Sequence, residues 1–98
     1  MRTHELKTWP EPFQAIVDGR KQFEIREDDR GFAVGDLLVL REYEPGQMRF
    51  TGRRYKARVT YLAPGGKWGI PERLCVMSIV PASMSATPSA KEADHECA

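Results

Sequence analysis

The chain has 98 residues, of which 41% are hydrophobic and 9% aromatic, and its formal net charge is +1. These values are typical of one small globular domain, whose modest core cannot surround a large multi-step active site. No stretch is long and apolar enough to span a bilayer, and the first residues lack the hydrophobic run of a signal peptide. We therefore expect a cytoplasmic protein that does not enter membranes.

The first part of the chain predicts a strand, a helix and a second strand. Residues 3–7 alternate in polarity, as half-buried strands do. Proline is tolerated in the first turn of a helix, so the next element begins near Pro10 and ends near Asp18. Gly19 is then expected in the left-handed conformation of a helix C-cap. Residues 22–26 alternate again and form the second predicted strand.

Three more strands are predicted at residues 37–43, 53–62 and 75–80. The strand at 53–62 is expected to turn one set of side chains inward, namely Tyr55, Ala57, Val59 and Tyr61. Several short strands with one or two short helices indicate a mixed α/β fold with predominant β structure, arranged as a small β-barrel. The domain is expected to occupy residues 1–80. Residues 81–98, rich in Ser, Ala, Thr and Pro, are expected to form a disordered tail.

Residues 19–26, Gly-Arg-Lys-Gln-Phe-Glu-Ile-Arg, place a helix end beside three charged side chains. Lys21, Glu24 and Arg26 are expected to lie close together, with Phe23 and Ile25 on the core side of the strand. Opposite charges on rigid elements can bind a polar ligand or assist a proton transfer. They can equally form a salt bridge on the face of a sheet.

The pattern Gly-x-Lys-x-x-Glu-x-Arg, followed by Gly-Phe-Ala-Val-Gly-Asp at 31–36, resembles the signature of the ASCH domain, a small β-barrel branch of the PUA-like superfamily. The resemblance covers residues 3–80. His-Glu-Leu-Lys at 4–7 and Trp-Gly-Ile at 68–70 are similar to a phage and bacterial branch of unknown function. Because ASCH proteins include an amidohydrolase that acts on an N-acylated cytidine, the resemblance implies a catalytic role for Lys21.

The amidohydrolase pattern is incomplete in this chain. The resemblance places Glu24 where the hydrolytic relatives carry a threonine, and Glu72 is the acid available where those relatives have a later glutamate. A carboxylate does not replace a hydroxyl nucleophile without a change of mechanism. Lys21, Glu24 and Glu72 are therefore the catalytic residues only if the protein is an enzyme.

A basic row provides the clearest physical sign of a ligand. Arg54, Lys56 and Arg58 share one face of a predicted strand, and no acidic residue occurs between Glu44 and Glu72. Cations spaced in this way can follow a phosphate backbone, although outward strand positions also carry charge for solubility. Trp68 is either a stacking surface for a base or a core residue.

The remaining reactive residues predict no metal site and no cofactor. Cys75 lies in an apolar run and is expected in the core, whereas Cys97 lies next to the C-terminus, so a disulfide is not expected. His4 is expected as a satisfied core or rim histidine, and His95 belongs to the tail.

We therefore expect a domain that binds RNA or a nucleotide-like ligand through Lys21, Glu24 and Arg26, with phosphate contacts from the basic row. One alternative is a small hydrolase of a modified nucleoside. Another is a phage-type module that binds a host protein through the acidic turn at residues 27–31. The sequence does not set the oligomeric state.

Overall fold

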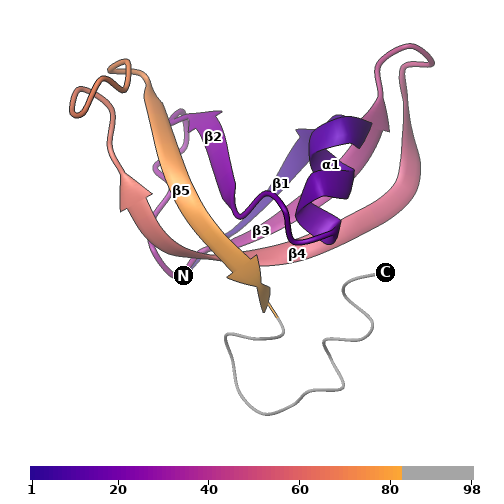
Figure 1. Ribbon diagram of the computed structural model, residues 1–98, viewed down its shortest axis with the longest axis horizontal. Helices are drawn as coiled ribbons and strands as arrows, with labels where there is room; N and C mark the ends of the chain where they lie inside the picture. The colour runs from indigo at the N-terminus through magenta and orange to yellow at the C-terminus, as the bar shows by residue number, and fades with distance from the viewer. Residues whose placement is uncertain (83–98) are drawn as a thin grey trace.

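The computed structural model describes residues 1–82, which form a five-stranded sheet and one helix (Figure 1). The elements in chain order are β1 (Thr3–Thr8), α1 (Pro10–Val17), β2 (Phe23–Glu27), β3 (Leu37–Glu44), β4 (Arg49–Ala63) and β5 (Leu74–Pro81). The predicted fold class, mostly β structure with a short helix, is confirmed. The expected tail lies outside the described residues except for its first two positions.

The sheet has the strand order β1-β3-β4-β5-β2 and curls into a half-barrel (Figure 1). β1 runs parallel to β3, and the other neighbouring pairs are antiparallel. β4 is long enough to pair with β3 along its first part and with β5 along its second part, which lets it carry the bend. The two edge strands, β1 and β2, remain unpaired with each other, so the half-barrel is open between them.

The helix α1 packs against β3 and fills the concave side of the half-barrel (Figure 1). Phe13 and Ile16 project from it into a core that includes Leu40, Cys75 and Met77. The prediction that Cys75 is a core residue is confirmed, and burial raises the pKa of its thiol. Within residues 1–82 no helix has the length and apolar character needed to cross a bilayer.

The end of α1 determines where Lys21 lies. Gly19 has a φ of 82°, which confirms the predicted left-handed C-cap. The backbone N–H groups of Arg20 and Lys21 both donate to the Ala15 carbonyl, at 2.9 and 3.0 Å. This tight turn reverses the chain and places Lys21 immediately before the edge strand β2.

The expected orientation of β2 is wrong. Phe23 and Ile25 are 43% and 51% exposed, whereas Glu24 is only 4% exposed. The alternating pattern fits either face, because its period of two does not say which side is buried. β2 is an edge strand, and Glu24 finds cationic partners on its inner side, while Ile25 lies beside Val76 of β5 on the outer side.

A β-bulge changes the faces of β4. Val59 pairs with Ile79, and the next pair along the ladder is Tyr61 with Ser78. Thr60 is therefore an extra residue in β4 between the two pairs. Tyr61 is consequently exposed rather than in the core, where the sequence pattern had placed it. The predicted start of this strand at residue 53 was also too late, because β4 begins at Arg49 after a short turn.

Candidate functional site

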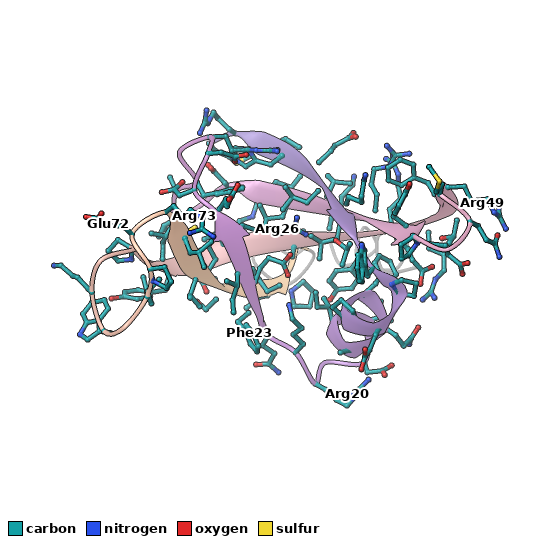
Figure 2. The ribbon with its side chains drawn as sticks, turned by 90° about the horizontal axis from the view of Figure 1, so that it is seen from above. Arg20, Phe23, Arg26, Arg49, Glu72 and Arg73 are labelled. Atoms are coloured by element: carbon teal, nitrogen blue, oxygen red, sulfur yellow. The ribbon has the colours of Figure 1, made fainter. Side chains whose placement is uncertain are left out.

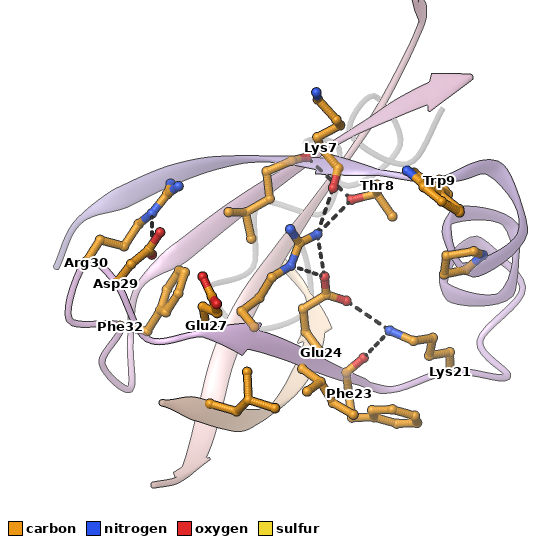
Figure 3. A pocket seen from close by; sticks show the side chains of 15 residues that line it. Lys7, Thr8, Trp9, Lys21, Phe23, Glu24, Glu27, Asp29, Arg30 and Phe32 are labelled. Carbon is orange, nitrogen blue, oxygen red and sulfur yellow. Dashed lines mark hydrogen bonds and ion pairs between the residues drawn. The ribbon is translucent and has the colours of Figure 1, made fainter. Parts of the chain in front are cut away.

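A cleft of about 570 Å³ lies between the two edge strands, close to the start of α1 (Figure 3). Its apolar walls include Leu6, Phe32 and Leu74. Charged side chains from β2 and the preceding turn provide much of its polar surface. The open side of the half-barrel is therefore a concave site with mixed apolar and charged character.

The carboxylate of Glu24 is held between two cations (Figure 3). Lys21 Nζ lies 2.9 Å from Oε1, and Arg26 Nε donates to Oε2 at 2.7 Å. Lys21 also donates to the Phe23 carbonyl at 2.7 Å. The three charged residues predicted to lie together do so, and they form an ion-pair triad in which the central acid, Glu24, is buried and the two cations are partly exposed.

Arg26 also connects the two edges of the half-barrel. Its Nη2 donates to the Lys7 carbonyl at 2.9 Å and to Thr8 Oγ1 at 3.3 Å. A guanidinium group has five N–H donors in a fixed planar arrangement, so it can contact Glu24 and β1 simultaneously. One side chain thus fixes the distance between β1 and β2 across the cleft.

Trp9 is a residue of the cleft that the sequence interpretation missed. It occupies the N-cap position of α1, lines the cleft and is 58% exposed. The signal that could have identified it is its place immediately before the helix-starting Pro10, at the junction between β1 and α1. Trp9 presents an aromatic surface at the mouth of the cleft.

Comparison with known proteins identifies the family. A family described as a domain of unknown function, DUF3850, matches residues 3–79. The chain belongs to the DUF3850 family. This DUF3850 chain is also 36% identical over 67 residues to "Uncharacterized 12.9 kDa protein in GpA 3'region" of Escherichia phage P2. The match covers 68% of the chain but 60% of the phage protein, so the chain spans less than two thirds of that relative's length.

Two other predicted site residues of the DUF3850 chain lie away from the cleft. Glu72 belongs to the exposed loop before β5, at the opposite end of the molecule from Arg49 at the start of β4 (Figure 2). Trp68 lies in the same loop with its side chain exposed, so it is not a core residue. Neither residue lines the cleft that contains Lys21.

The basic row lies on the outer face of β4, and its three members differ. Arg54 is exposed, whereas Lys56 and Arg58 are half-buried. Arg58 Nη1 donates to the Gly35 carbonyl at 3.1 Å, which ties it to the turn before β3. The predicted row is therefore not a uniformly exposed line of cations.

The acidic turn of this DUF3850 domain is largely engaged within the chain. Asp28 Oδ1 accepts the Phe32 N–H at 3.1 Å. Glu27 pairs with Arg73, and Asp29 pairs with Arg30, each at 3.3 Å. Residues 1–82 contain no cluster of three His, Cys, Asp or Glu side chains arranged to hold a metal ion.

Proposed function

We propose that this DUF3850 domain binds a nucleotide-like ligand, such as an unpaired base of RNA, in the cleft between β1 and β2. The observation that carries the proposal is the buried Glu24 carboxylate, held by Lys21 and Arg26 in a cavity with apolar walls. Small-molecule sites combine apolar walls with a few polar groups in fixed positions. Because the cations fix the carboxylate, the site is ordered before a ligand arrives.

The triad has the hydrogen-bonding capacity that a nucleobase requires. A carboxylate offers about four lone-pair sites, so Glu24 Oε1 can accept the Lys21 ammonium and an amine of a base. The nearby ammonium and guanidinium donate to ring nitrogens or carbonyl oxygens. Unpaired bases are recognised by such contacts along their edges, together with stacking on an aromatic side chain. Trp9 offers that surface at the mouth of the cleft.

The resemblance to ASCH domains supports the same site, because Lys21, Glu24 and Arg26 are the charged positions of the shared pattern. Hydrolysis of an N-acylated cytidine is the second candidate function. The Lys21 ammonium donates to both Glu24 and the Phe23 carbonyl, and this engagement favours a role in binding over one as a base. Glu72, the acid proposed as its catalytic partner, lies outside the cleft.

The test is a calorimetric titration of the protein with the common nucleosides and with a short single-stranded RNA. Glu24→Gln is expected to weaken binding at least about tenfold, since it removes a charge-assisted acceptor. Glu72→Gln is the matched control, because it neutralises an exposed carboxylate outside the cleft. Equal affinity of the two variants, or no binding of any of these compounds to the parent protein, would contradict the proposal.

The same samples test the hydrolase. Release of acetate from N4-acetylcytidine by the parent protein, lost in Lys21→Ala, would replace the binding function with hydrolysis. A stable complex without turnover is the outcome that we expect.

A further inference from the structure

A second groove, of about 360 Å³, lies beside the cleft along β1. Four cationic side chains line it, namely Lys7, Arg26, Arg30 and Arg41. Phe50 and Leu6 add apolar surface, and Glu5 is the single acidic residue of its wall. Arg26 and Arg30 are paired with Glu24 and Asp29 of the adjoining cleft, so the available positive charge of the groove comes mainly from Lys7 and Arg41. A concave surface with this charge is suited to an anion.

Two of these cations are held by aromatic rings. The Arg41 guanidinium carbon lies 4.0 Å from the centre of the Phe50 ring, and Lys7 Nζ lies 4.2 Å from the centre of the Tyr43 ring. The two rings contact each other edge to face at 5.0 Å. Rings position these cations without cancelling their charge. Glu5 Oε1 is 3.6 Å from Arg41 Nη1, but that pair is partly exposed and therefore weak.

The groove and the cleft are neighbours on the molecule. Lys7, Arg26 and Arg30 line both of them. Arg26 contacts Glu24 on the cleft side and the β1 backbone at the boundary between the two. The exposed Arg54 is the register partner of Arg41 on β4, which extends the positive charge beyond the groove. A polymer that has one group bound in the cleft can therefore extend across β1 along these cationic side chains.

We propose that the groove binds the phosphodiester backbone of a single-stranded nucleic acid, a proposal that rests on the proposed recognition of an unpaired base in the cleft. Arginine forms short, charge-assisted hydrogen bonds with phosphate oxygens. Phe50 provides an apolar face for a neighbouring base, and alternating cations and aromatic rings are the usual composition of single-strand sites. The ligand is then an oligonucleotide rather than a free nucleoside.

The experiment compares a fluorescein-labelled single-stranded RNA, single-stranded DNA of the same sequence, the corresponding RNA duplex and free nucleosides. Arg41→Gln is expected to weaken RNA binding about five- to tenfold and to reduce the slope of log affinity against log salt by about 0.7. Nucleoside affinity is expected to stay unchanged, because Arg41 does not line the cleft. Lys67→Gln, an exposed loop cation outside both cavities, is the matched control for net charge.

Arg54→Gln is a second test variant, to be used if Arg41→Gln does not fold. Because the Arg54 side chain is exposed, this substitution is expected to leave folding undisturbed. If both arginine variants bind RNA like Lys67→Gln, or if the duplex binds more tightly than the single strand, the groove proposal is overturned. If nucleosides do not bind and Glu24→Gln leaves RNA binding intact while Arg41→Gln weakens it, the cleft assignment fails and the backbone surface remains. Weaker binding of DNA than of RNA would identify RNA as the source of the phosphodiester.

Discussion

His4 Nε2 lies 2.8 Å from Asp36 Oδ2, and this buried contact joins β1 to the residue that precedes β3. Asp36 also accepts the backbone N–H groups of Arg2 and Ala33, at 3.0 and 3.1 Å. Burial alone would raise the pKa of this carboxyl, but the hydrogen bonds from His4 and the two backbone groups outweigh it. The pKa of Asp36 is therefore lowered from its usual value of 3.8.

The first prediction concerns acid stability. Since the pKa of Asp36 is lower in the folded state, its ionised form stabilises the fold above about pH 4, and this contribution is lost as pH falls through the folded-state pKa. Asp36→Asn is expected to reduce the free energy of unfolding near neutral pH by about 1–3 kcal/mol. The substitution is also expected to make the decrease in the free energy of unfolding at acid pH less steep.

Urea unfolding of the parent and Asp36→Asn proteins across the acid range measures both effects. Asp29→Asn is the control, because that carboxyl is exposed. An acid decline as steep in Asp36→Asn as in the parent would show that other carboxyls cause it.

The second prediction tests the orientation of β2. Ile25→Ala is expected to change the free energy of unfolding by less than about 0.5 kcal/mol, because Ile25 is half exposed. Ile79→Ala removes the same atoms from a buried site and is expected to cost about 2–5 kcal/mol. Denaturant midpoints of the two variants give the comparison directly, and similar costs would mean that Ile25 is buried.

The sequence allowed the order and type of the elements to be predicted, because hydrophobic periodicity and glycine and proline positions are local signals. The proximity of Lys21, Glu24 and Arg26 could also be predicted, since they fall within six residues. The inward direction of Glu24 was not predictable from alternation alone. It depends on β2 being an edge strand, which is a property of the whole sheet.

The groove along β1 could not be predicted from local sequence patterns either. Lys7, Arg26 and Arg41 belong to three different strands, and only the parallel pairing of β1 with β3 and the curl of the sheet bring them together. The sequence favoured the basic row of β4 instead, because its cations occupy alternate positions of a single strand.

The third prediction separates the two cations of the triad. Both Arg26→Ala and Lys21→Ala leave Glu24 buried with a single partner, so both are expected to destabilise the fold. Arg26→Ala is expected to cost more, about 3–5 kcal/mol, because it also removes the contacts with Lys7 and Thr8. Thermal melting ranks the variants. A larger loss for Lys21→Ala would mean that the bridge between the sheet edges contributes little.

The fourth prediction divides the basic row. Arg58→Gln is expected to lower the free energy of unfolding by about 1–3 kcal/mol, since it leaves the Gly35 carbonyl without the Arg58 donor. Arg54→Gln removes an exposed cation and is expected to have little effect on unfolding. Chemical denaturation of the pair checks this, and equal stability of the two variants would contradict it.

The bulge at Thr60 gives β4 two segments of opposite parity. Before it, odd-numbered residues such as Val59 are buried; after it, the odd-numbered Tyr61 is exposed and Leu62 packs against the core. Deleting Thr60 would remove the bulge and leave a regular ladder in which Tyr61 still faces outward beside Ser78 and Leu62 still faces the core beside Met77. The side chains after Thr60 are therefore distributed for the shifted register, and the bulge is encoded in the spacing of Tyr61 and Leu62 as much as in Thr60 itself.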